Sequence, residues 1–302
     1  MTITSMGFGI FLAVLSSLSC ARSCTFTITN NCPHPVWPGT LAGAGTPPLP
    51  TTGFRLESGQ SVRIPSTPGW SGRIWARTGC SFDPSGIGKC ETGDCGGRLE
   101  CDGNGATPPA SLFEITVGSG EEKDFYDVSI VDGYNLPLLV VPRGVYGPCN
   151  ATGCASDLNL GCPKELQVVL GGDGGQQGQG GVVACKSACE AFGLDQYCCS
   201  GQFSNPNTCH PSIYSTIFKH ACPRAYSYAY DDGTSTFTCK AYDYEIVFCP
   251  SVNGTKKASN ETIATPHIEE PSSGELIHLV SSSNILLPFP LAIIFILINL
   301  LS

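Results

Sequence analysis

Residues 72–86 read GRIWARTGCSFDPSG and residues 90–97 read CETGDCGG, and this stretch decides the fold of the chain. Residues 73–77 are predicted to form a β-strand, in which successive side chains alternate between two faces, so both arginines and the tryptophan lie on one face and Ile74 on the other. Four cysteines follow within 22 glycine-rich residues, at positions 80, 90, 95 and 101. Because so few apolar residues cannot form a core alone, the stretch predicts a strand followed by a region that disulfides stabilise.

The composition of the whole chain points to an oxidising compartment. Its 302 residues include 18 Cys, 36 Gly and 23 Pro, and 14% of them are charged. Thiols at this density persist only as disulfides or metal ligands, which excludes an ordinary cytosolic enzyme and favours a secreted, turn-rich protein. Sixteen Lys and Arg against 25 Asp and Glu give a net charge of −9. This balance excludes a nucleic-acid partner, which requires a basic surface.

The apolar runs between the cysteines are short and alternate with period two. They predict strands at 25–29, 61–64, 73–77, 111–117, 125–131 and 245–248, with a turn at Asp132-Gly133. Helical segments are expected only at 183–192 and 213–220. We therefore expect a mainly β fold, an antiparallel β-sandwich.

The first 23 residues are predicted to be a secretory signal peptide. An apolar run from Gly7 to Leu18 precedes small residues, so cleavage after Ala21 or Ser23 satisfies the small-residue rule. A buried N-terminal strand is the competing interpretation, and it is disfavoured because no charged residue breaks the run.

The last residues, 284–302, form a hydrophobic tail without charge. Small residues at Ser272, Ser273 or Gly274, followed by a spacer and this tail, are typical of attachment of a GPI lipid anchor, which would make the membrane a partner. A single spanning helix is the alternative. Two prolines in its first turns and the lack of a following Lys or Arg count against it.

The segment 251–283, rich in Ser, Thr, Asn and Glu, has no apolar periodicity and is predicted to be a flexible stalk. Three Asn-X-Thr triplets, at Asn150, Asn253 and Asn260, predict N-glycosylation of a secreted surface. Together these features predict a secreted protein held at the outer face of the plasma membrane.

Several catalytic and metal-binding classes find no support in the sequence. No CxxC pairs with another and the five His are scattered, so we expect no metal and no cofactor. A Gly-x-Ser-x-Gly nucleophile motif is absent. The glycine-rich segment 171–181 lacks the Lys-Ser/Thr of a phosphate loop, and its single Asp is too little for calcium, so a surface loop is expected.

Longer motifs carry a specific resemblance. They are GRIWARTGCSFDPSG at 72–86, CETGDCGG at 90–97, DFYDVSIVDGYNLP at 124–137, QYCC at 196–199, CPRAYSY at 222–228 and TFTC at 236–239. With these motifs the chain resembles the thaumatin-like proteins, plant pathogenesis-related family five, over residues 24–250. The number of cysteines from Cys32 to Cys249 is sixteen, which is the number that forms the eight disulfides of that family.

The resemblance implies an architecture and a disulfide pairing. A β-sandwich core would comprise 24–77, 109–155 and 223–250, with a small disulfide lobe at 78–108, a partly helical disulfide lobe at 156–222 and an acidic cleft between the lobes. The implied pairs are Cys32–Cys249, Cys80–Cys90, Cys95–Cys101, Cys149–Cys239, Cys154–Cys222, Cys162–Cys185, Cys189–Cys198 and Cys199–Cys209. Cys24, which has no counterpart in the family, would be an odd thiol.

The resemblance also implies a site. The cleft of many members is lined by one Arg, one Glu and three Asp, which correspond to Arg73, Glu114, Asp127, Asp132 and Asp232. The chain departs from the family at Phe113, where Ala is more common before the Glu, and in the long glycine-rich segment. Clustered carboxylates with an Arg and nearby aromatic rings suit sugars, because carboxylates accept hydrogen bonds from hydroxyls and ring faces stack on C–H surfaces.

The family therefore implies a monomeric, secreted plant defence protein that binds β-1,3-glucan of fungal walls, or another wall polysaccharide, and is antifungal. One alternative is a weak endo-β-1,3-glucanase with Glu114 as acid and Asp132 as its partner, since hydrolysis needs one protonated and one ionised carboxyl. Two further alternatives are a structural salt-bridge network around Arg73 and a module that binds a protein, such as an inhibitor of a foreign hydrolase.

Overall fold

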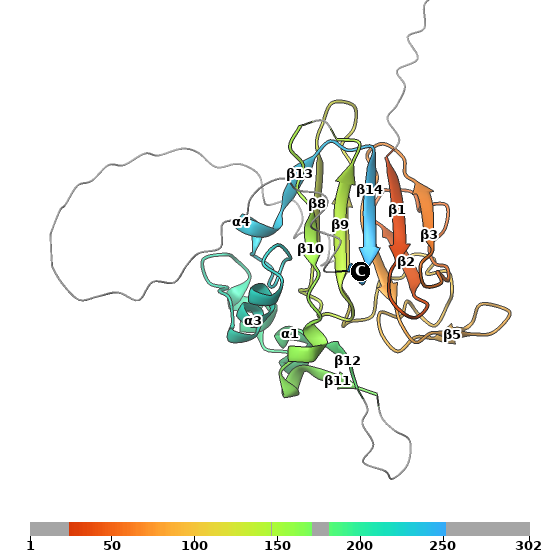
Figure 1. Cartoon of the computed structure of the whole chain (residues 1–302). Coiled ribbons are helices and arrows are strands. Elements are labelled where there is room, and N and C mark those ends of the chain that lie inside the picture. Colours follow the sequence, from red (N-terminus) through yellow and green to blue (C-terminus); the bar gives the residue numbers. More distant parts are fainter. Residues whose placement is uncertain (1–23, 146, 171–180, 252–302) are drawn as a thin grey trace, which may run out of the picture. The chain divides into compact units, whose positions relative to one another are not determined.

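Two five-stranded β-sheets form the body of the protein (Figure 1). The computed structural model describes residues 24–145, 147–170 and 181–251. The first sheet has the order β10 (Thr152–Cys154), β9 (Leu138–Arg143), β14 (Asp243–Phe248), β1 (Thr25–Asn30) and β3 (Ser61–Pro65). The second has the order β13 (Phe237–Cys239), β8 (Asp124–Ser129), β7 (Leu112–Thr116), β4 (Ser71–Arg77) and β2 (Trp37–Ala42). The six predicted strands all occur within this arrangement.

One pairing departs from an entirely antiparallel sandwich. β1 is antiparallel to β3 but parallel to β14, with Phe26 opposite Tyr244 and Ile28 opposite Ile246. Antiparallel neighbours are usually joined by short hairpins, whereas β1 and β14 come from the two ends of the domain, so no hairpin fixes their direction. The last strand of the domain thus lies at the centre of the first sheet.

Apolar side chains from both sheets meet in one continuous core. Phe26 of β1 and Phe113 of β7 have ring centroids 6.3 Å apart, and Tyr126 of β8 lies 5.1 Å from Tyr244 of β14. All four rings are at most 1% exposed. Aromatic rings at these separations bury large apolar areas, and this burial holds the two layers together.

A small lobe covers part of the outer face of the second sheet. It contains β5 (Ser81–Phe82) and β6 (Gly88–Lys89) and packs on β4. The Nε1 atom of Trp75 donates to the Gly93 carbonyl at 2.9 Å, and the guanidinium of Arg77 donates to the carbonyls of Arg98 and Leu99, each at 2.7 Å. Both side chains are fully buried. Arg73, on the same face of β4, stays exposed beyond the edge of this lobe.

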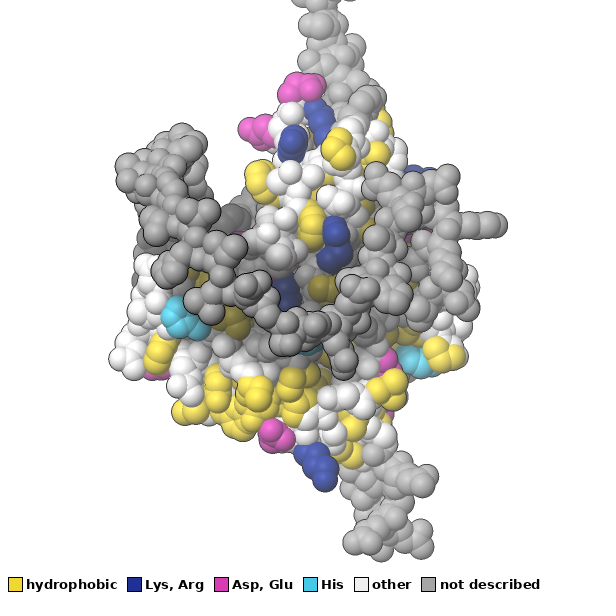
Figure 2. All heavy atoms as spheres, turned by 60° about the vertical axis from the view of Figure 1, so that its left-hand side comes forward, with side chains coloured by type: hydrophobic (Ala, Val, Ile, Leu, Met, Phe, Trp, Pro, Cys, Tyr) yellow, Lys and Arg dark blue, Asp and Glu magenta, His cyan; other side chains and the backbone are white. Residues whose placement is uncertain are grey.

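A second lobe, partly helical, follows β10. Its elements are β11 (Gln167–Val169), β12 (Val182–Cys185), α1 (Ala188–Phe192), α2 (Asp195–Cys198), α3 (Ile213–Ala221) and three 3₁₀ helices (Leu158–Gly161, Lys164–Leu166 and Gly201–Phe203). α4 (Asp232–Ser235) comes before β13. In Figure 2, where the left-hand side of Figure 1 is turned forward, hydrophobic side chains gather low on the face that carries these helices.

The two predicted helices fared differently. α3 confirms the helix expected at 213–220, and it begins at a capping box formed by Ser212 and Ser215. The helix expected at 183–192 is wrong in its first half, because Val182–Cys185 is a strand that pairs with β11. The side chain of Ser187 then caps α1 by accepting from the backbone N–H of Glu190.

Eight disulfides cross-link the described residues. They join Cys32–Cys249, Cys80–Cys90, Cys95–Cys101, Cys149–Cys239, Cys154–Cys222, Cys162–Cys185, Cys189–Cys198 and Cys199–Cys209. These pairs are the same as those implied by the family resemblance. Cys24 is left with a free thiol that is 3% exposed, and burial raises its pKa to about 12.

Several predicted features lie outside the described residues. They are the signal peptide, the glycosylation sites Asn253 and Asn260, the lipid-attachment site at 272–274, the tail at 284–302, residues 252–283 of the stalk and residues 171–180 of the glycine-rich loop. Within the described ranges, no helix is long and apolar enough to cross a membrane.

Candidate functional site

Three of the five predicted site residues form a row across the second sheet. Arg73 of β4 lies directly opposite Glu114 of β7, which in turn lies directly opposite Asp127 of β8. Side chains at directly opposite positions share one face and have Cβ atoms about 4.5–5.5 Å apart. The Nε atom of Arg73 is 3.2 Å from Oε1 of Glu114, so the two form an ion pair. Strand register alone therefore brings an arginine and two carboxyls together.

The two carboxyls of this row have raised pKa values. Burial raises the pKa of Glu114, and the charge of Asp132 adds to the effect while Arg73 opposes it. The pKa of Asp127 is raised well above its ordinary value by burial, with further contributions from Glu114 and Asp232 and opposition from Arg73. Two adjacent carboxyls cannot both ionise without strong repulsion, so the pair tends to keep a proton.

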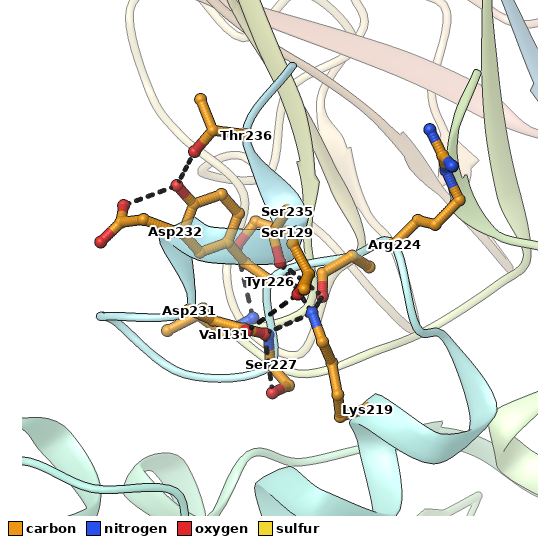
Figure 3. Close-up of polar contacts among 12 residues, drawn as sticks. Ser129, Val131, Lys219, Arg224, Tyr226, Ser227, Asp231, Asp232, Ser235 and Thr236 are labelled. Atoms are coloured by element: carbon orange, nitrogen blue, oxygen red, sulfur yellow. Dashed lines mark hydrogen bonds and ion pairs between the residues drawn. The ribbon is translucent and has the colours of Figure 1, made fainter. Parts of the chain in front are cut away.

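Asp232, the first residue of α4, approaches the row from the segment before β13. The hydroxyl of Tyr226 donates to Oδ1 of Asp232 at 2.8 Å and also contacts the hydroxyl of Thr236 (Figure 3). The backbone of Tyr226 is itself fixed, since its N–H donates to Val128 at 2.8 Å and its carbonyl accepts from Ile130 at 2.9 Å. Tyr226 thereby holds Asp232 beside the end of β8, where its charge acts on Asp127.

The neighbouring Asp231 has a structural role instead. Its Oδ2 atom accepts from the Lys219 ammonium at 2.8 Å and from the backbone N–H of Ser227 at 3.0 Å (Figure 3). The same ammonium donates to Ser235 at 2.8 Å and to the Ala225 carbonyl at 3.1 Å. This cluster ties α3 to the loop that carries Asp232, and so it keeps the loop in place.

Asp132 approaches Glu114 from the turn that follows β8. The backbone N–H of Gly133 donates to the Ile130 carbonyl at 3.1 Å, which closes the predicted turn. Gly133 has a φ of +83°, and a Cβ atom there would lie 2.5 Å from Cβ of Pro109, so only glycine fits. Asp132 is thus held where its charge raises the pKa of Glu114.

Glu190 is a further carboxyl at this site that sequence reasoning missed. Tyr134 and Cys185 exchange backbone hydrogen bonds of 2.8 and 2.7 Å, which brings α1 next to the turn at Asp132. Burial raises the pKa of Glu190 to about 7; Lys186 lowers it and Asp132 raises it. Its Oε2 atom is buried and has no hydrogen-bond partner among the described residues. No motif marks Glu190, because its proximity to Asp132 arises only in the folded protein.

Phe125 was also missed. It lies two residues before Asp127 on β8 and directly opposite Thr116 of β7, which places its side chain on the same face as Asp127. It is 56% exposed, which is unusual for a phenylalanine in the middle of a sheet. The sequence could have predicted the exposure of Phe125 only from the alternation of β8, in which Tyr126 and Val128 face the core and Phe125 and Asp127 face outward.

Together these residues form what we call the carboxyl face: the outer side of β4, β7 and β8 with the turn at Asp132 and the loop at Asp232. All five predicted residues contribute to it. Protonated and ionised carboxyls can there donate and accept hydrogen bonds, Arg73 supplies a fixed positive charge, and Phe125 supplies an exposed ring. Such a surface can bind a polyhydroxylated ligand.

Comparisons with known proteins agree with this architecture. The model of the thaumatin family matches residues 30–250. The chain is 55% identical over 80% of its length to "Pathogenesis-related protein 5" of Arabidopsis thaliana, of which 96% is covered. It is 51% identical over 76% of its length to "Glucan endo-1,3-beta-glucosidase" of Prunus avium, of which 92% is covered.

A solved structure of a laminaripentaose-producing β-1,3-glucanase in complex with laminaritetraose shares the fold. The match has a TM-score of 0.50 and 12% sequence identity, and it covers 76% of this chain and 99% of the other. At this identity the likeness concerns the fold alone.

Proposed function

Because the chain belongs to the thaumatin family, we propose that it is a secreted, cell-surface plant defence protein that binds β-1,3-glucan of fungal walls through its carboxyl face. The observation that carries the proposal is the row formed by Arg73, Glu114 and Asp127. A glucan chain presents hydroxyls, which act as donors and acceptors, and apolar C–H faces. The row offers both kinds of hydrogen-bonding partner, and Phe125 offers a stacking surface.

The compartment follows from the covalent structure. Eight disulfides persist only where the environment is oxidising, which supports secretion to the cell wall or the outer membrane face. Asn150 is exposed and therefore accessible to glycosylation. Attachment of a lipid anchor near residues 272–274 is part of this proposal, and release of the protein from intact cells by a phospholipase that cleaves such anchors tests it.

Hydrolysis of the glucan is a second candidate function, which the name of the Prunus avium relative favours. Hydrolysis needs a protonated acid and an ionised partner. Glu114 would act as the acid and Asp132 as the partner. The raised pKa of Asp127 makes this residue an alternative acid beside Glu114.

The two candidates separate in one experiment on the purified protein. Sedimentation with insoluble β-1,3-glucan measures binding, and release of reducing sugar from soluble β-1,3-glucan measures hydrolysis. The variant Asp127→Asn should weaken binding about tenfold, as expected for loss of a hydrogen-bonding carboxyl group. The variant Glu114→Gln should lose hydrolysis but keep binding if the protein is an enzyme.

The chain offers a matched control. Arg143 and Glu245 form a similar ion pair of 2.6 Å on the first sheet, so Glu245→Gln should change neither binding nor hydrolysis. Binding without hydrolysis selects the wall-binding protein. If the unmodified protein neither binds nor cleaves the glucan, the whole proposal is wrong.

A further inference from the structure

A pocket on the helical lobe lies apart from the carboxyl face. Its volume is about 330 Å³, and residues of α2, the 3₁₀ helix Gly201–Phe203 and the start of α3 line it. This is at the lower end of the range of roughly 300–1,000 Å³ that small-molecule sites occupy. Tyr197 and Phe203 contribute rings to its wall, and Ile213, which is 72% exposed, lies at its edge.

An aromatic cluster stiffens one wall of the pocket. The ring of Tyr197 lies 5.6 Å from that of Phe192 and 6.0 Å from that of Tyr214, and the last two rings are 5.4 Å apart. The hydroxyl of Tyr214 is anchored by donating to Glu165 at 2.9 Å. A ring fixed on several sides presents its surface to a ligand at little cost in conformational entropy.

Disulfides fix the rest of the wall. Cys198 and Cys199, which follow Tyr197 directly, are bonded to Cys189 of α1 and to Cys209 respectively. Cys209 directly precedes His210, another residue of the wall. Covalent links on both sides hold the pocket open before any ligand binds, a property that favours affinity.

The chemistry of the lining selects a class of ligand. None of the eight lining residues is Asp, Glu, Lys or Arg, so phosphates, nucleotides and charged peptides find no partner. Gln196, Thr208 and His210 instead supply amide, hydroxyl and imidazole hydrogen-bonding groups around the aromatic surface. Among the described residues, no side chain is hydrogen-bonded to the Gln196 amide or to the His210 ring. Aromatic rings beside the available Gln196 amide and His210 ring suit an uncharged hexose, which has apolar C–H faces and hydroxyl edges.

A narrow hollow extends from the pocket toward the carboxyl face. It has a volume of about 20 Å³, enough for one water molecule, and shares Gln196, Tyr197, His210 and Ser212 with the pocket. At its other end it is lined by Val131, the neighbour of Asp132.

We propose that this pocket is a second sugar-binding site, which takes one neutral hexose unit of an oligosaccharide independently of the carboxyl face. Its ligand stacks on Tyr197 and is hydrogen-bonded by Gln196 and His210. This second site does not depend on the proposed binding of glucan at the carboxyl face. Each of the two sites can therefore be tested with a variant that impairs the other.

The test uses laminaritetraose, a linear tetramer of β-1,3-linked glucose, and isoleucine-methyl NMR of the purified protein. The methyl signal of Ile213 should shift saturably on titration, since this side chain lies at the edge of the pocket. The shift should persist with the same affinity in Asp127→Asn, which weakens binding at the carboxyl face and leaves the pocket intact. Tyr197→Ala and the double variant Gln196→Ala/His210→Ala should each weaken this binding about tenfold.

The controls keep the test independent of folding. Gln196 and His210 are exposed, so their replacement leaves the core intact, and Gln202→Ala removes a neighbouring exposed glutamine that does not line the pocket. Gln202→Ala should bind like the unmodified protein. The inference is overturned if neither laminaritetraose nor a β-1,4-linked glucose tetramer shifts Ile213, or if a tetraproline peptide shifts it and the sugars do not.

Discussion

At the scale of single residues, burial decides the protonation of the carboxyl face. For Glu114, Asp127 and Glu190, burial is the largest cause of the raised pKa, and the charges of neighbouring carboxylates come after it. Arg73 opposes the shift at Glu114 and Asp127 without cancelling it. A carboxyl that keeps its proton can donate a hydrogen bond, whereas an ionised carboxylate can only accept one. The carboxyl face therefore offers both donors and acceptors from carboxyl groups alone.

Glu190 gives a prediction about stability and pH. Its pKa rises from an ordinary value of 4.5 to about 7 on folding, so the folded protein holds the proton more tightly than the unfolded chain does. The stabilisation is therefore fully present below pH 4.5 and is lost as the pH rises to about 7. We expect Glu190→Gln to flatten the decline of the free energy of unfolding across this window, measured by urea unfolding at pH 4.5, 5.5 and 7.

The matched control for this prediction is Glu91→Gln, which alters an exposed glutamate. It should leave the pH profile unchanged. If Glu190→Gln reproduces the slope of the unmodified protein, Glu190 ionises at its ordinary pKa in the folded state.

At the scale of elements, alternation in the sequence located six of the fourteen described strands and could not supply their assembly. Alternation in 73–77 and 111–117 placed Arg73 and Glu114 on defined faces, because a strand has a period of two. It could not supply the register that sets Glu114 between Arg73 and Asp127. The family resemblance implied only that these residues share one cleft, and the structure supplies the pairing that sets their order.

The segment 183–192 shows why local sequence patterns fail to predict the secondary structure of the helical lobe. Val182–Cys185 is a strand because it pairs with β11 and because the backbone of Cys185 exchanges hydrogen bonds with that of Tyr134. Both contacts are distant in sequence. The same non-local contacts bring Glu190 near Asp132. Neither could be read from the residues around Glu190.

The loop between α3 and β13 gives a prediction for one element. In Tyr226→Phe the backbone hydrogen bonds to β8 remain, but Asp232 and Thr236 lose the hydroxyl that contacts both. We expect glucan affinity to fall about fivefold, the effect of one hydrogen bond of about 1 kcal/mol. Hydrogen–deuterium exchange in residues 232–236 should become faster.

Tyr228→Phe is the control, since the Tyr228 hydroxyl has no hydrogen bond among the described residues. It should alter neither the affinity nor the exchange. Unchanged exchange in Tyr226→Phe would show that the Lys219–Asp231 ion pair alone holds the loop.

At the scale of the whole molecule, covalent links supplement a core that is confined to the sandwich. The small lobe contributes few apolar residues and is held by its two disulfides and by Trp75 and Arg77 of β4. The helical lobe is cross-linked internally and through Cys154–Cys222 to β10. Both lobes flank the sheet on which the carboxyl face lies.

The disulfides differ in the length of chain that they enclose, and this gives a prediction. Cys32–Cys249 joins residues 217 apart, whereas Cys80–Cys90 joins residues 10 apart. By the loop-entropy relation, removing the first should cost about 5 kcal/mol and removing the second about 3 kcal/mol. Guanidinium unfolding of the two double Cys→Ala variants measures the difference. Equal costs would mean that the unfolded chain keeps residual structure near these links.

The position of β14 also determines when the protein can fold during synthesis. This strand lies between β9 and β1, so the first sheet is divided into two separate parts until residues 243–248 have left the ribosome. Until then Phe26 and Ile28 of β1 lack Tyr244 and Ile246, the residues of β14 that lie opposite them. The nascent chain therefore exposes unpaired strand edges during most of its translation. A premature stop codon even a few residues before Asp243 would therefore remove the middle of the sheet rather than its margin, and we expect such a product to be degraded by quality control instead of exported.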